Sequence, residues 1–233
     1  MSFRPFPLRQ YERHSQVHSR SRTSPMLADI KLPDSSLARQ AEELTRAVSN
    51  DMLFNHVMRC YWFGELFAHQ EGTKVDSELL FLSCVFHDLG LTEHAPGPHR
   101  FEIEGASAAR TFLVDRACPV DRAQQVWDNI ALHTWDINLF RGDTSRVTQL
   151  GIAHDVVGVP QGQQLDRADV AEILRRYPRL NFTRAFHDTL EHEVDSKQPY
   201  PHTFHPCTRI ACSRGPIEIV DMRTIQSGAP FDE

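Results

Sequence analysis

The segment DSELLFLSCVFHDLGLTE, residues 76–93, constrains the fold most, because it places a His-Asp pair in an otherwise apolar helical pattern. Asp76 is a suitable N-cap, the apolar residues after it recur at helical spacing, and Gly90 is a typical stop. We therefore predict a helix with His87 and Asp88 in its last turn. The helix dipole disfavours a carboxylate there, and a bound cation would remove this conflict. The alternative is a capping histidine beside a solvated aspartate, an ordinary arrangement at helix ends.

From residue 35 onward the sequence predicts helices separated by short loops. The expected helices begin near Ser35, Asn50, Asp76, Glu104, Asp121, Asp143, Asp166 and Thr183. No strand pattern of comparable length occurs, so the predicted fold class is all-α. We expect an irregular Arg-rich arm at residues 1–34, a helical domain at 35–195, and a tail at 196–233 that packs on the domain.

Composition narrows the classes of function. A net charge of -6 over 233 residues argues against a nucleic-acid surface, because such surfaces are usually basic. No apolar run approaches about 18 residues, so we expect no membrane span. A small-molecule substrate is the expected partner. The five cysteines form no C-x-x-C pair and no secretory signal is expected, which indicates reduced thiols in a cytoplasmic protein.

The first 24 residues carry five arginines against one glutamate, a net charge of +4. They lack helical apolar periodicity, so we expect an irregular arm that can pack on a partner subunit of a homo-oligomer. A mitochondrial presequence is the alternative, since such segments are rich in Arg and poor in acids. Pro5 and Pro7 weaken the amphipathic helix that targeting requires.

Histidines and carboxylates recur within apolar helical patterns on four predicted helices, namely His56, the His87-Asp88 pair, His133 and Asp155. Buried polar groups cost free energy unless they are paired or bind a metal. Any one of them is more often a core residue with a partner, but the set together favours a metal site. Imidazole nitrogens and carboxylate oxygens suit Zn, Fe, Mn or Co.

The order of these residues resembles the HD-domain metal-dependent hydrolase superfamily, in which H, HD and a final D lie on different helices of an all-α fold. Within it, residues 44–204 resemble the cyanamide hydratase branch. The similar segments are NHVMRCYWFG (55–64), FHDLGLTE (86–93), RFEIEGASAARTFL (100–113), IALHTWDIN (130–138), HDVVG (154–158) and KQPYPHTF (197–204). The resemblance implies an HD-domain helical bundle in which His56, His87, Asp88 and Asp155 bind one divalent ion, Zn²⁺ first, with Fe, Mn or Co as alternatives.

The same resemblance implies an enzyme that hydrates a small nitrile, cyanamide to urea, by metal-activated water. The candidates for proton transfer are Glu102, Glu104 and His133. A single residue separates the two glutamates, so at most one is expected to face the site. In superfamily members with two metals, histidines after HD hold the second ion, so His133, or His94 and His99 in the loop, are alternative ligands.

Two rival functions stay open from the sequence. An HD-type phosphohydrolase acting on a nucleotide would need positive groups near the metal, and Arg59, Arg100 and Arg110 are candidates. The sequence contains no Gly-rich phosphate loop. The other rival is a catalytically inert, metal-stabilised binding protein. His202 and Thr203 are expected to close over the pocket, and its apolar walls are expected from Trp62, Phe63, Phe86, Phe101 and Trp135.

Overall fold

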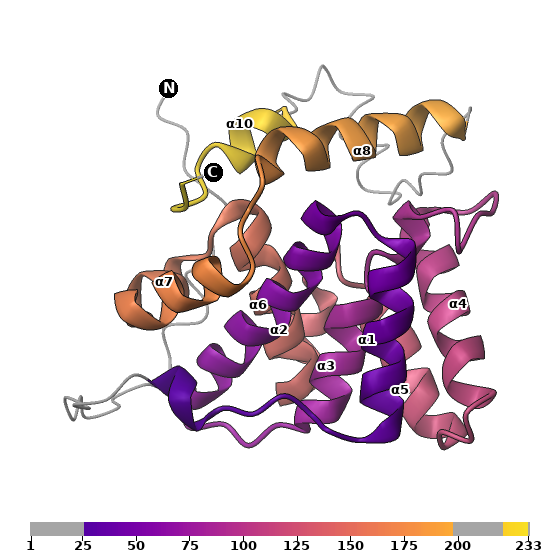
Figure 1. The fold of residues 1–233 in the computed structure, drawn as a ribbon, viewed down its shortest axis with the longest axis horizontal. Coiled ribbons are helices and arrows are strands. Elements are labelled where there is room, and N and C mark those ends of the chain that lie inside the picture. The colour runs from indigo at the N-terminus through magenta and orange to yellow at the C-terminus, as the bar shows by residue number, and fades with distance from the viewer. Residues whose placement is uncertain (1–25, 198–220, 233) are drawn as a thin grey trace, which may run out of the picture.

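The structure, a computed structural model, describes residues 26–197 and 221–232. Within these ranges the chain forms α-helices and short 3-10 helices and no strand, which confirms the predicted all-α class (Figure 1). The α-helices are α1 (Ser36–Val48), α2 (Asp51–Glu71), α3 (Ser77–Phe86), α4 (Phe101–Val114), α5 (Val120–Ala131), α6 (Asp143–Val157), α7 (Arg167–Arg176), α8 (Phe182–Ser196) and α10 (Met222–Gln226). The 3-10 helices are η2 (Met26–Asp29), η3 (Leu89–Leu91), η4 (Asp136–Phe140) and η5 (Pro160–Gln164).

Much of the predicted arm and tail, including the expected lid residues His202 and Thr203, lies outside the described residues. The part of the arm that the structure describes packs on the body, because Leu27 is buried and its backbone N–H donates to Asp169 Oδ1 at 3.0 Å. In the described ranges, no helix combines the length and the apolarity that crossing a bilayer requires.

Helix α2 is the centre of the core, with nearly every residue from Met52 to Ala68 buried. It packs most extensively against α6 and also against α3. The close approach to α6 depends on Gly151, where an added Cβ would lie 2.3 Å from the Cys60 carbonyl oxygen. The α2 and α6 backbones therefore pass near one another at the level of the predicted site residues.

The capping pattern that the sequence predicts is largely present. Ser35, Asn50, Asp76 and Asp166 each accept a hydrogen bond from a backbone N–H in the first turn of the helix that follows. Helices α4 and α5 begin without a side-chain cap. Helix α4 begins at Phe101 rather than near Glu104, and Pro119 precedes α5.

The prediction for the end of α3 was wrong. The helix ends at Phe86, so His87 is its C-cap and Asp88 lies beyond it with φ −104° and ψ 14°. Gly90 belongs to η3 instead of stopping the helix. An added Cβ at Gly90 would lie 1.9 Å from the Phe101 carbonyl oxygen, so this glycine is required by the contact with the start of α4.

Helix α8 runs across one end of the bundle, at the top of Figure 1, with α10 beside it. Its residues Phe182 and Phe186 pack with Met52 and Leu53 of α2 in a small apolar cluster separate from the main core. The chain enters α8 through two residues with positive φ, Leu180 and Asn181. Helix α8 thus covers the N-terminal part of α2.

Candidate metal centre

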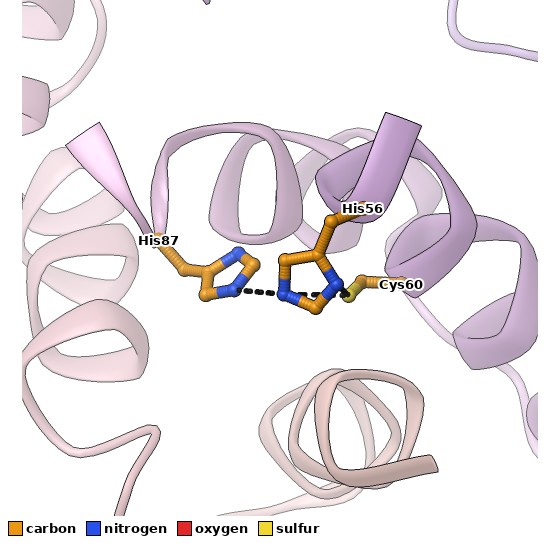
Figure 2. Close-up of side chains that lie close together, drawn as sticks. All are labelled: His56, Cys60 and His87. Carbon is orange, nitrogen blue, oxygen red and sulfur yellow. Dashed lines mark hydrogen bonds between the residues drawn. The ribbon is translucent and has the colours of Figure 1, made fainter. Parts of the chain in front are cut away.

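Three of the predicted site residues meet in the interior. His87 and Asp88 directly follow α3, and His56 projects toward them from α2. The Nε2 atoms of His56 and His87 are 3.2 Å apart (Figure 2). Asp88 Oδ2 lies 3.4 Å from His56 Nε2 and 3.2 Å from His87 Nε2. All three side chains are at most 1% exposed.

His133 stands at the edge of this group, two residues beyond the end of α5. Its Nε2 lies 4.0 Å from Asp88 Oδ1, and its ring centroid is 4.9 Å from that of His87. The ligand-type atoms of His87, Asp88 and His133 all lie within 4.8 Å of one another. Burial, and after it the neighbouring His87, lowers the pKa of His133 to about 3. A neutral imidazole therefore faces the Asp88 carboxylate.

Hydrogen bonds at Nδ1 orient all three rings. His87 Nδ1 donates to the Cys84 carbonyl oxygen and His133 Nδ1 to the Ile130 carbonyl oxygen, each at 2.7 Å. His56 Nδ1 lies 2.7 Å from an Asp155 carboxylate oxygen. A carbonyl or carboxylate accepts, so each Nδ1 carries a proton, and in the neutral form of each ring Nε2 presents its lone pair to the cluster.

Asp88 shows what the cluster requires. Both of its carboxylate oxygens are buried and neither has a hydrogen-bond partner. Burial alone would raise the pKa of Asp88, but His87 and then His56 and His133 hold it at about 2. Burial alone would lower the pKa of His87, but Asp88, the Cys84 carbonyl and Asp155 together outweigh burial and raise it. A carboxylate among three Nε2 atoms thus attracts positive charge, and a divalent cation fits this donor set.

Asp155 lies on the other side of the His56 ring. Arg59 binds it through both oxygens, Nε to Oδ1 at 2.7 Å and Nη2 to Oδ2 at 2.8 Å, and Arg179 Nη1 donates to Oδ1 at 3.2 Å. Burial would raise the pKa of Asp155, but Arg59 and His56 hold it far below its usual range. Asp155 therefore reaches the cluster through His56, an arrangement that fixes the ring of a metal-binding histidine.

Cys60 packs against His56 one helical turn along α2 (Figure 2). Its Sγ lies 3.6 Å from Nδ1 and 3.7 Å from Nε2 of His56. These nearly equal distances place the sulfur equally far from both ring nitrogens rather than closer to one of them. Burial raises the pKa of Cys60 well above its ordinary value, so the thiol is neutral. The ligand-type atoms of His56, Cys60 and His87 nevertheless lie within 4.8 Å of one another, so Cys60 is a further candidate ligand if its thiol loses the proton.

The structure separates the two candidate glutamates. Glu102 is 4% exposed, and its Oε1 accepts from Thr134 Oγ1 at 2.7 Å, while its Oε2 is buried without a hydrogen-bond partner. Glu104 instead accepts from the backbone N–H and the ring Nδ1 of His99, both at 2.8 Å. Glu104 therefore faces the loop before α4. His99 and His94 are exposed in that loop and do not join the cluster.

Sequence reasoning missed the aromatic cover of the site. The ring of Phe182 stacks on His56 with centroids 4.6 Å apart, and Phe186 follows at 5.3 Å. Among the predicted wall residues, Phe101 contacts the cluster, with its ring centroid 5.6 Å from that of His133, whereas Trp135 is 43% exposed. The i, i+4 spacing of the two phenylalanines was a readable signal for an apolar face of α8, although it does not say what that face covers.

Arg179 and Thr134 were also missed. Both lie outside the helices. Arg179 donates a hydrogen bond to Asp155, and Thr134 donates one to Glu102. His154, beside Asp155, points elsewhere and packs edge-on against the stacked rings of Phe63 and Phe231. Burial lowers the pKa of His154 to about 4, so the ring packs there in its neutral form.

No protein-family model matches the chain. Two relatives do: the Saccharomyces cerevisiae proteins cyanamide hydratase DDI2 and cyanamide hydratase DDI3. Each is 25% identical to this chain over 186 residues, which cover 76% of this chain and 80% of the relative. The chain is therefore a distant homologue of these two yeast cyanamide hydratases, in agreement with the resemblance that its sequence motifs indicate.

Proposed function

We propose that this protein hydrates a small nitrile, converting cyanamide to urea, with one divalent ion held by His56, His87 and Asp88. The observation that carries the proposal is the buried convergence of Nε2 lone pairs on an Asp88 carboxylate whose oxygens have no hydrogen-bond partner. Zn²⁺ is the first candidate for such N and O donors, with Fe, Mn and Co as alternatives. A bound divalent cation would lower the pKa of water and polarise the nitrile.

The surrounding residues would hold this geometry. Asp155 and Arg59 fix the His56 ring, and the Cys84 carbonyl fixes that of His87. Asp155 belongs to the ligand set that the superfamily implies. We propose that here it acts on the ion through His56, because both of its oxygens are already bonded to guanidinium groups.

Hydration of cyanamide needs one C–O bond and two proton transfers. The water oxygen bonds to the nitrile carbon, one C–N π pair moves to the nitrile nitrogen, and that nitrogen takes the first water proton, which gives isourea. When the second proton leaves the oxygen, the O–H electron pair becomes the C=O bond and the remaining C–N π pair takes this proton on the same nitrogen, which gives urea. His133 can accept a hydrogen bond from water at Nε2 because its Nδ1 already donates to the Ile130 carbonyl oxygen, and its low pKa means that it relays the proton to the nitrile nitrogen and does not keep it. Glu102, with a buried free oxygen, is the better placed of the two glutamates to orient the substrate.

A phosphohydrolase is less well supported. The arginines that would neutralise a phosphate have other partners: Arg59 binds Asp155, Arg100 pairs with Glu102 at 3.3 Å, and Arg110 donates to Gln124 on the surface. The two buried carboxylates at the site, Asp88 and Glu102, would also repel an anion. A neutral substrate suits these charges better.

The test is urea release from cyanamide by the metal-loaded protein, run beside phosphate release from nucleotide monophosphates. We expect urea from the parent, none from His87→Ala, and parental rates from His192→Ala, which removes an exposed histidine of α8. Phosphate without urea would replace the proposal with the phosphohydrolase. If EDTA lowers the melting temperature and the parent turns over neither substrate, the inert binding protein is favoured.

A further inference from the structure

The carboxylate of Glu102 is a buried charged group that the metal cluster does not explain. Its Oε1 has two donors, Thr134 Oγ1 at 2.7 Å and Arg100 Nη1 at 3.3 Å. Its Oε2 has less than 1 Å² of exposed surface and no hydrogen-bond partner. A buried acceptor left without a donor costs free energy, of the order of 1–3 kcal/mol. The fold therefore leaves Oε2 without a hydrogen bond, although Oε1 of the same carboxylate accepts two.

Its position relates this oxygen to the proposed reaction. Glu102 lies in the first turn of α4, next to Phe101, whose ring contacts His133. The backbone of Phe101 packs on Gly90, two residues after Asp88. Thr134, the donor to Oε1, directly follows His133. The carboxylate is therefore hydrogen-bonded to the residue that follows His133, and the residue before Glu102 packs against the segment that follows Asp88.

We infer that Oε2 of Glu102 accepts a hydrogen bond from an N–H group of the substrate, and that Thr134 is the positioning residue that turns this oxygen toward it. The inference rests on the proposed function and deepens it by naming what the site selects. The substrate class is a small neutral molecule with an N–H donor beside the carbon that is attacked. Cyanamide has that donor, whereas dialkylcyanamides and simple nitriles lack it.

Thr134 makes the inference testable because its hydroxyl donates to Glu102 although the residue is exposed. The residue is exposed, so Thr134→Val should fold normally while it removes the donor to Oε1. Thr134→Ser keeps the hydroxyl and is the rescue variant. Thr111→Val, at an exposed threonine further along α4, is the matched control.

The experiment compares cyanamide, methylcyanamide and dimethylcyanamide, which carry two, one and no N–H donors. We expect the parent to use dimethylcyanamide at least ~100-fold less well by kcat/KM, because a site built around a hydrogen bond rejects the analogue that lacks it. Thr134→Val should raise the KM for cyanamide about 10-fold with little change in kcat, as loss of ground-state binding predicts. Thr134→Ser and Thr111→Val should match the parent.

A second readout does not depend on turnover. Calorimetric binding of urea and of tetramethylurea to the metal-loaded protein should favour urea, and Glu102→Gln and Thr134→Val should weaken that preference. If cyanamide is hydrated but these variants keep the parental KM and selectivity, the inference is overturned and the proposed function stands. If cyanamide is not hydrated, the proposed function fails. In that case a urea preference lost in Thr134→Val supports the inference, and equal or absent binding overturns it.

Discussion

Single side chains around Asp155 determine how His56 is presented to the site. One carboxylate, fully buried, accepts from two arginines and from the His56 ring. Charge-assisted bonds of this kind are stronger than neutral ones, and together they offset the cost of burying the carboxylate. The direction of His56 Nε2 therefore depends on residues that make no contact with the rest of the metal cluster.

Asp155→Asn should lower Zn²⁺ affinity by about 10–100-fold, the usual effect of losing the group that orients a ligating histidine. The ion should still bind, because His56, His87 and Asp88 remain. Competition with a chelating dye measures the affinity, and Asp166→Asn, which keeps an N-cap on α7, is the control. Complete loss of binding in Asp155→Asn would instead make Asp155 a direct ligand.

Arg59→Lys keeps the charge but loses the fork that binds both oxygens of Asp155 and also donates to the Tyr177 carbonyl oxygen. We expect the free energy of unfolding to fall by about 2–4 kcal/mol, since hydrogen bonds to charged groups contribute about 1.5–3 kcal/mol each. Chemical denaturation provides the measurement. Arg175→Lys, at an exposed arginine, should leave stability unchanged, and an equal loss in both variants would refute the special role of Arg59.

At the scale of elements, α3 must be fixed at both ends to deliver His87 and Asp88. Its N-terminus is capped by Asp76, which accepts from the Leu79 N–H at 2.9 Å and pairs with Arg122 of α5. Its C-terminus ends against η3, which packs on the first residue of α4. The position of the His-Asp pair is thus set by contacts to two neighbouring helices.

The two functions of Asp76 can be separated. Asp76→Ala should cost about 1 kcal/mol through the lost cap, whereas Asp76→Asn keeps a capping oxygen and loses only the charge. Arg122 and the Leu79 N–H lower the pKa of Asp76, so the ion pair stabilises the fold above about pH 4 and loses this effect as the pH falls through the folded pKa. Stability measured against pH should therefore fall less steeply in Asp76→Asn below pH ~4. An unchanged acid limb would contradict this account.

Gly90→Ala tests the contact between η3 and α4. The added Cβ would lie 1.9 Å from the Phe101 carbonyl oxygen, so one of the two elements must shift. We expect a loss of about 3 kcal/mol or more, at the upper end of overpacking effects. Because η3 follows Asp88 directly, Zn²⁺ affinity should fall as well. Gly228→Ala, where the nearest atom is 3.3 Å away, should change neither, and parental stability in Gly90→Ala would show that the contact relaxes freely.

At the scale of the whole molecule, the sequence predicted what depends on local signals. The all-α class and the caps at Ser35, Asn50 and Asp76 follow from short-range patterns, and the structure has them. The end of α3 could not be predicted from local patterns, because Gly90 is required by a tertiary contact with Phe101. The two arginines on Asp155 could not be placed either: Arg179 lies 24 residues from its partner, in a loop without periodicity.

The same limit applies to the cover of the site. Helix α8 was expected, but its position across α2, with Phe182 on His56, depends on the left-handed turn at Leu180 and Asn181. Local sequence gives little warning of such a turn at leucine, because a positive φ is disfavoured for a bulky side chain. The resemblance to a family named four candidate ligands. The structure brings His56, His87 and Asp88 together and places Asp155 against the far nitrogen of His56.

The central claim is that the buried His-Asp cluster holds one divalent ion, and metal content tests it most directly. The parent protein, loaded with Zn²⁺ and then dialysed against metal-free buffer, should retain about one ion per chain. Asp88→Asn should retain almost none, because it removes the carboxylate at the centre of the cluster, and Asp166→Asn should match the parent. A parent that retains no metal, or an Asp88→Asn variant that retains as much as the parent, would contradict the account.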